Sequence, residues 1–285
     1  MPEGACYDHL ERAKKGLRET VEKSRTVLIC HHDEPLNRFG LARWMASFTD
    51  LAAIVVVREP QGRLRKRIRR EIERVGILRF LDVLAFRVYY RLSLARGDRA
   101  WTEATLQKLA QRYGDIPESC RVLETPSPNS VEALQLLRDV QPDLIVARCK
   151  NILKADIFKT AQKGTFVMHP GICPEYRNAH GCFWALANRD VNNVGMTLLR
   201  VDAGVDTGPV YGYYKYAYDE LRESHTVIQN RVVLDNLDSL RAKFEDILAG
   251  RAQSIDTAGR KSRAWGQPWL TSYVRWKRAA ARGPK

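Results

Sequence analysis

The sequence predicts an α/β protein with a doubly wound, mostly parallel β-sheet. Short segments of continuously apolar residues recur along the chain, and segments with apolar residues at helical spacing lie between them. A continuously apolar segment indicates a strand that is buried on both faces, as strands are in a parallel sheet. Strands that alternate with helices are typical of sheets that helices cover on both sides.

The apolar segments locate the expected strands. The first ends at a run of polar residues, and the fourth ends at a histidine that Pro-Gly follows. Ligand sites of open α/β sheets form at such strand ends. The expected strands span residues 25–30, 51–57, 142–147, 164–169, 194–199 and 210–217.

Helical spacing of apolar residues predicts the helices. One helix has Ser130 as a plausible N-cap and Glu132 in its first turn, which is a common pattern at helix starts. The last predicted helix is long, and its apolar face is either core or the interface of a homodimer. The expected helices span residues 38–48, 103–113, 130–140 and 224–248.

A helical insertion at about residues 60–100 departs from the alternation of strand and helix. A basic helix at 63–74 precedes an amphipathic segment at 77–94. The insertion is compatible with a solvated face beside a core helix, with docking on a membrane surface, or with binding of nucleic acid or phosphate. The cations of the basic helix are Arg63, Arg65, Lys66, Arg67, Arg69, Arg70 and Arg74.

The C-terminal tail, residues 249–285, is basic and rich in Trp. Its interleaved aromatic and cationic residues suit stacking on bases, anchoring at a membrane interface, or packing on the main domain. We therefore expect an α/β domain over residues 1–248, with the insertion inside it, and a tail over residues 249–285.

The charge of the chain favours anionic partners. The sequence has 47 Lys and Arg against 33 Asp and Glu, which gives a formal net charge of +14. Nucleotides, phosphorylated substrates, RNA and an acidic membrane surface all complement such a charge.

Other features of the composition favour the cytoplasm. No apolar run approaches the roughly 20 residues of a membrane span, and the N-terminus, which has Glu3 before any basic residue, does not resemble a secretory signal. No Cys-x-x-Cys pair is present, so we expect reduced thiols and no metal site. The cysteines are Cys6, Cys30, Cys120, Cys149, Cys173 and Cys182.

Two polar segments in the second half of the chain follow predicted strands. His169 ends a strand and begins a loop bounded by prolines, and Asp202 and Asp206 lie in a Gly-rich turn between two later strands. A histidine at a strand end can donate to a developing oxyanion, and a carboxylate can accept a proton. We take His169 and Asp206 as the candidate catalytic pair.

Together these segments resemble the formyltransferase family, which includes glycinamide ribonucleotide, methionyl-tRNA and nucleotide-sugar formyltransferases. The resemblance rests on His-Pro-x-x-x-Pro-x-Tyr-Arg followed by Trp-Ala-Leu, and on Gly-Met-Thr-Leu continuing into Val-Asp-Ala-Gly-Val-Asp-Thr-Gly-Pro. It implies a Rossmann-like fold and a one-carbon transferase that moves a formyl group from 10-formyltetrahydrofolate to an amine. His169 and Asp206 match the family's histidine and aspartate.

The resemblance also suggests binding residues. Segment 147–153 is similar to the family's folate-side segment. The polar cluster after the first strand is expected either to bind a small acceptor, anionic or sugar-like, or to lie in water at the surface. Contacts to the folate donor are expected from Arg148, Ile152, Leu153, Asp202 and Gly204. Contacts to the acceptor are expected from His31, His32, Asn37, Tyr176, Arg177, Asn178 and His180.

Two positions differ from the family pattern. Val167 stands where the family's Asn-x-His motif has an asparagine, so a hydrogen-bond donor is absent, and Arg148 stands where the purine-pathway members have glycine. Asn151, Asn178 and His180 are the nearest polar residues in the motif regions that could replace this donor. Three interpretations remain: a folate-dependent formyltransferase, a transferase with a non-folate donor, or a catalytically altered protein that binds an anionic partner such as a membrane surface, nucleotide or RNA.

Overall fold

The computed structural model describes residues 23–60 and 64–283, without the side chains of residues 64–67. Cys6 and Arg63 therefore lie outside the described residues, as do the side chains of Arg65, Lys66 and Arg67 of the predicted basic helix.

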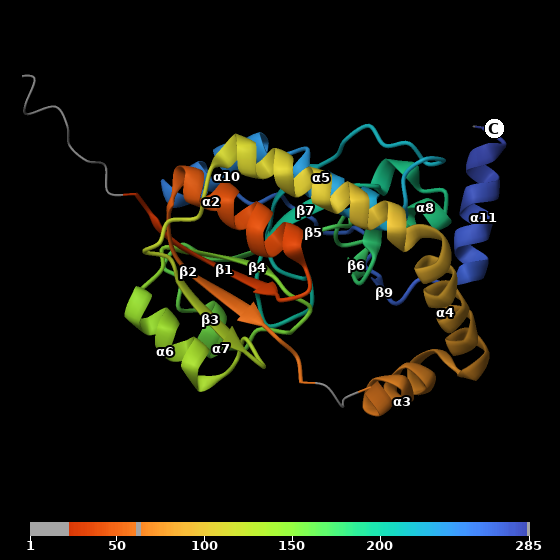
Figure 1. Ribbon diagram of the computed structural model, residues 1–285, viewed down its shortest axis with the longest axis horizontal. Coiled ribbons are helices and arrows are strands. Elements are labelled where there is room, and N and C mark those ends of the chain that lie inside the picture. The colour runs from red at the N-terminus through yellow and green to blue at the C-terminus, as the bar shows by residue number, and fades with distance from the viewer. Residues whose placement is uncertain (1–22, 61–63, 284–285) are drawn as a thin grey trace, which may run out of the picture.

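A seven-stranded sheet in the order β3-β2-β1-β4-β5-β7-β8 forms the centre of the molecule (Figure 1). The first five strands of that order are parallel, and β7 and β8 are antiparallel to their neighbours. The doubly wound, mostly parallel sheet predicted from the sequence is thus confirmed. The strands are β1 (Arg25–His31), β2 (Asp50–Val57), β3 (Arg121–Thr125), β4 (Leu144–Arg148), β5 (Gly164–His169), β7 (Met196–Arg200) and β8 (Val210–Tyr214).

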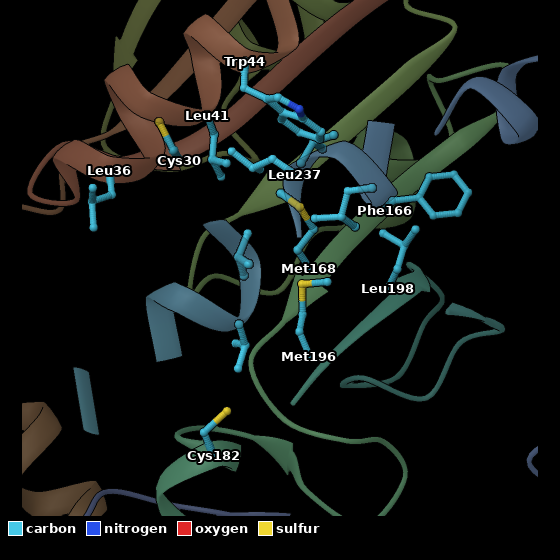
Figure 2. Close-up of a cluster of buried hydrophobic side chains, with 14 of the residues drawn as sticks. Cys30, Leu36, Leu41, Trp44, Phe166, Met168, Cys182, Met196, Leu198 and Leu237 are labelled. Carbon is cyan, nitrogen blue, oxygen red and sulfur yellow. The ribbon is translucent and has the colours of Figure 1, made fainter. Parts of the chain in front are cut away.

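Helices cover both faces of the sheet (Figure 1). The helices α2 (Ala42–Phe48), α5 (Ala95–Tyr113) and α10 (Leu237–Leu248) lie over one face, and α6 (Val131–Val140) and α7 (Ala155–Phe158) lie over the other. Successive strand residues point to opposite faces, so Leu28 of β1 belongs to one buried cluster and Val27 to the other. Figure 2 shows part of the larger cluster, to which Trp44, Phe166 and Leu237 belong.

The helix ends differ from expectation in two places. The helix expected at 38–48 begins as a π-helical segment (Leu36–Leu41) that continues into α2. The helix expected at 224–248 is two helices, α9 (His225–Leu234) and α10. Asn236 separates them, because its backbone leaves the helical conformation while its side-chain Nδ2 donates to the carbonyls of Lys215 and Val232.

The insertion consists of helices that extend to one end of the molecule (Figure 1). The helix α3 (Leu64–Val75) is followed by α4 (Ile77–Tyr89), which continues through a π-helical segment (Tyr90–Leu94) into α5. Gly76, with φ of 80°, separates α3 from α4, because positive φ is accessible to glycine at little cost. Across residues 23–60 and 64–283, we find no helix with the length and apolar character of a membrane span.

The tail packs on the rest of the chain. Its strand β9 (Ala264–Trp265) pairs with β6 (Arg177–Asn178), and its helix α11 (Leu270–Ala281) contacts α4 and α8 (Gly181–Ala187). The ring of Trp265 stacks on Tyr176 and on Trp184. Among the roles considered for the tail's tryptophans, these contacts favour packing on the main domain. Outside the tail, a short 3₁₀-helix (Val191–Asn193) precedes β7.

We predict that the tail and the sheet unfold together. Trp276 of α11 is fully buried and its Nε1 donates to Glu220, so Trp276→Ala should lower the free energy of unfolding by about 3–5 kcal/mol, measured by urea denaturation. Arg282→Ala, at the exposed residue that directly follows the same helix, is the control and should change it by less than about 0.5 kcal/mol. An unchanged midpoint in Trp276→Ala would show that the tail is an independent appendage.

Candidate functional site

A cleft of about 730 Å³ lies at the carboxyl ends of β4 and β5. These strands are neighbours, with Ala147 of β4 opposite Val167 of β5, so Arg148 and His169 meet at the same edge of the sheet. The turn at residues 201–206, helix α9 and the tail supply the other walls. The volume lies within the range of small-molecule sites.

His169 lies between two oxygen atoms. Its Nε2 is 2.8 Å from the carbonyl oxygen of Tyr176, and its Nδ1 is 3.5 Å from Oδ2 of Asp206. The residue is only 4% exposed but still reaches the wall of the cleft. The predicted pair of His169 and Asp206 is therefore brought together.

The turn that carries Asp206 is held by its own side chains. Oδ1 of Asp202 accepts hydrogen bonds from the N–H of Gly204 and from the hydroxyl of Thr207, at 2.9 and 2.8 Å. Asp206 itself has a φ of 52°, and Oδ2 accepts the N–H of Asn178 at 2.7 Å. The backbone of this turn thus aims the carboxylate at the loop that follows His169.

The loop after His169 is packed too tightly for a larger residue at Gly171. A Cβ there would lie 2.6 Å from the carbonyl oxygen of Tyr176 and 2.8 Å from Nε2 of His169. The tail holds the other end of the loop, since Nδ2 of Asn178 donates to the carbonyl of Trp265 at 2.6 Å. The sequence motif and the tail together fix the position of His169.

Arg148 reaches from the end of β4 toward His169. Its Nε donates to Oδ1 of Asn37 at 3.2 Å, and its Nη1 donates to the carbonyl of Met168. Burial lowers the pKa of the Arg148 guanidinium. Val167, which cannot donate a hydrogen bond, lines the same cleft.

Most of the predicted site residues lie at the cleft. Asn37 bridges Arg148 and Glu34 through its side-chain amide, and His180 extends from the loop after His169 toward α9. Those that line the cleft are His169, Asp206, Arg148, Ile152, Leu153, Asp202, Gly204, Asn37, Asn178 and His180.

Two predicted acceptor residues from the end of β1 lie outside the lining of the cleft. His31 is buried, its Nε2 accepts the N–H of Lys150 at 2.9 Å, and burial lowers its pKa. The ring of His32 contacts Arg38 at 2.8 Å and lies 3.5 Å from Glu124. His31 therefore links the end of β1 to the segment that follows β4. His32 belongs to a cluster of charged groups with Arg38 and Glu124 of β3.

Tyr176 and Arg177 also lie outside the lining. The hydroxyl of Tyr176 donates to Asp190 at 2.8 Å, and Nη1 of Arg177 donates to the carbonyl of Val205 at 2.8 Å. Both side chains thus support the loop and the turn that carry the pair, while the backbone carbonyl of Tyr176 contacts His169.

Sequence reasoning missed polar residues of α9, α3 and the tail. Helix α9 is buried at Val227, Ile228 and Val232, yet Gln229 and Asn230 between them face the cleft. The available signal was this polar pair between the apolar residues Val227 and Ile228 on one side and Val232 and Val233 on the other. The missed lining residues include Glu71, Arg74, Thr226, Gln229, Asn230 and Gln267.

Two histidines lie together beside the cleft. Nδ1 of His180 is 3.2 Å from Oε1 of Gln229, and the ring centroid of His225 is 6.1 Å away from that of His180. Phe86 and Phe183 surround His225. Burial lowers the pKa of His180 to about 4 and that of His225 to about 3.

Solved structures share the fold. A sugar N-formyltransferase from Shewanella sp FDAARGOS_354 superposes with a TM-score of 0.51 at 14% identity, over 90% of this chain and 87% of that one. A phosphoribosylglycinamide formyltransferase from Anaplasma phagocytophilum gives 0.50 at 15% identity, over 86% and 100%. At these identities the likeness defines a Rossmann-like α/β protein.

Sequence comparison shows a likeness to one family. Residues 102–237 match the model of the formyl transferase family. Methionyl-tRNA formyltransferases from Kosmotoga olearia and from Neisseria meningitidis are each 30% identical, over 106 and 122 residues, or 37% and 40% of this chain. The matched segments span 32% and 39% of the length of those relatives. Residues 102–237 of the chain are therefore similar to the formyl transferase family.

The buried histidines predict an acid-sensitive fold. The pKa of His225 falls from 6.5 to about 3 on folding, so below pH 6.5 the unfolded chain binds a proton that the native chain does not. The free energy of unfolding therefore decreases as the pH is lowered from 6.5 toward 3. Between these values, His225→Phe should make this dependence shallower by about 1.4 kcal/mol per pH unit, measured by urea denaturation across pH.

A matched control disturbs the same aromatic cluster without removing a titratable group. Phe183→Leu should lower stability at every pH and leave the slope unchanged. An unchanged slope in His225→Phe would contradict the low native pKa of this histidine.

Proposed function

We propose that the chain transfers a formyl group from 10-formyltetrahydrofolate to an amine of a small acceptor that is anionic or sugar-like. The observation that carries this proposal is the approach of His169 to Asp206 at 3.5 Å in the wall of the cleft. The family domain, which includes both residues, supports it. We also propose that the reaction takes place in the cytoplasm, where the free thiols of Cys30 and Cys149 would stay reduced.

The reaction defines what the site must supply. The amine nitrogen forms a bond to the formyl carbon, and the bond between that carbon and N10 of the folate breaks. The amine loses one proton and N10 gains one. Negative charge develops on the formyl oxygen during attack, so a donor for this oxygen and an acceptor for the amine proton are needed.

Asp206 is the proposed proton acceptor. Oδ2 is committed to Asn178 and faces His169, whereas Oδ1 makes no hydrogen bond to the described part of the chain. His169 lies between the carbonyl of Tyr176, 2.8 Å from Nε2, and Oδ2 of Asp206, 3.5 Å from Nδ1. In this arrangement the His169 ring orients the Asp206 carboxylate.

Arg148 is the proposed donor to the formyl oxygen. Val167 leaves the position of the family's asparagine without a donor, and the Arg148 guanidinium lies at the neighbouring strand end, bonded to the carbonyl just before His169. Nε and Nη1 have partners, and Nη2 has none among residues 23–60 and 64–283. Nη2 is thus free to donate to a ligand.

The residues of segment 147–153 suit a folate donor. Oδ1 of Asn151 is buried without a hydrogen-bond partner in the described chain, and an amino group of a pterin would satisfy it. Ile152, at 66% exposure, offers an apolar surface for a flat ring. When bound, the folate would supply the formyl group. Arg74 and Lys150 also line the cleft, where they pair with Glu71 and Glu34.

Asp206→Asn tests the role of the carboxylate. The amide keeps the size of the side chain and can still accept from Asn178, but it cannot take a proton, so kcat should fall at least about 10²-fold. The assay measures tetrahydrofolate released from 10-formyltetrahydrofolate with amino sugars, nucleotide-linked amino sugars, glycinamide ribonucleotide or methionyl-tRNA. The exposed Asp139→Asn on α6 is the control and should keep full activity.

Two results would count against the proposal. Full turnover in Asp206→Asn would exclude Asp206 as the proton acceptor. No product with any acceptor, together with no folate binding to the unaltered chain, would favour a binding protein over a folate-dependent enzyme.

Arg148→Met tests the replacement donor. Loss of one oxyanion donor typically lowers turnover by about 10²–10³-fold, and we expect that loss in kcat here. Arg138→Met on α6 removes an equal charge at an exposed position away from the cleft and should be neutral. Adding Val167→Asn to Arg148→Gly restores the family pattern and should recover turnover. If Arg148→Met is as active as the unaltered chain, Arg148 is not the donor.

A further inference from the structure

An exposed apolar stripe runs along the insertion. Residues spaced three or four apart on α4 and the π-helical segment share one face of the helix, and no residue of the described part of the chain covers this face. Leu78 and Leu92, near the two ends of the stripe, are each 80% exposed. The stripe consists of Ile77, Leu78, Leu81, Leu84, Val88 and Leu92. Val83 and Phe86 on the opposite side of the helix anchor it to the core.

Cations accompany this stripe. Arg87 and Arg91 are exposed on the same helix, and helical spacing places Arg91 beside Leu84 and Val88. Helix α11 lies next to α4 (Figure 1) and exposes further arginines. Within α4, the π-helical segment and α11, the acidic residue is Asp82, which accepts hydrogen bonds from the backbone and hydroxyl of Thr271. The further arginines are Arg275 and Arg278 of α11 and Arg282, which directly follows the helix.

We propose that this face docks on an anionic lipid bilayer. A helix with an apolar stripe beside cations lies in the plane of a membrane interface, with its apolar side chains among the acyl chains and its cations at the headgroups. A second copy of the chain fits the face less well, because two such faces would bring arginines together without acidic partners. The docking does not depend on the proposed formyl transfer.

Docking would hold the cleft close to the bilayer. Helix α3, which precedes α4, contributes Glu71 and Arg74 to the cleft, and Arg74 lies against Gly266 of the tail. Helix α3 therefore links α4, which carries the apolar stripe, to the wall of the cleft.

The experiment is flotation of the full chain with vesicles. We expect binding to vesicles of equimolar phosphatidylcholine and phosphatidylglycerol, weak binding to phosphatidylcholine alone, and a decrease in binding with added salt. Leu78→Gln and Leu92→Gln should each lower the partition coefficient by about tenfold or more, since each removes a large apolar side chain from the interface. Arg87→Gln with Arg91→Gln should lower it only for anionic vesicles.

The matched control is Val131→Gln on α6. Val131 is also 80% exposed, but α6 lies on the other side of the sheet from the insertion (Figure 1), so binding should not change. Asp206→Asn should bind vesicles fully, which separates this proposal from the formyl transfer. No flotation with anionic vesicles overturns the proposal. It is also overturned if Leu78→Gln and Leu92→Gln leave flotation unchanged but convert a dimer into a monomer in sedimentation velocity.

Discussion

Oδ2 of Asp206 holds two groups that come from opposite ends of one loop, the N–H of Asn178 and the ring of His169. The carbonyl of Tyr176, inside that loop, contacts the other nitrogen of the same ring. His169 and Asp206 thus hold the loop whose backbone positions them. Gly171, which has no side chain, lets the backbone of this loop lie close to the His169 ring. The rest of the site depends on this contact, because the cleft wall between β5 and α9 is the surface of this loop.

Val167 and Arg148 belong to adjacent strands and are best understood together. Val167 on β5 lacks the amide donor of the family's asparagine. Beside it, at the end of β4, is the long cationic side chain of Arg148, where the family resemblance would place a glycine. The Arg148 guanidinium passes Asn37 and reaches the carbonyl before His169. The two departures from the family pattern therefore concern one small volume rather than two separate functions.

The buried strands were predictable because continuous apolarity reports burial on both faces, and Ser130 was predictable because N-cap chemistry is local. The edge strand β3 (Arg121–Thr125) was missed because its side chains are largely exposed and carry no apolar run. The break at Asn236 depends on the carbonyl of Lys215, which is distant in sequence. For the site, the two motifs located the pair, whereas the burial of His31 and the exposure of Gln229 to the cleft follow from packing between segments that local patterns do not encode.

The pairing of β9 with β6 has a consequence for the order in which the molecule is made. During synthesis, domains begin to fold from the N-terminal side, and all seven strands of the central sheet leave the ribosome before Trp265 does. The carbonyl of Trp265 and its ring contribute to holding Asn178 and Tyr176 in place, beside Asp206 and Asp190. A nascent chain can therefore have a complete sheet and an unfinished cleft, because the wall that Trp265 supports is completed only after that residue has been made.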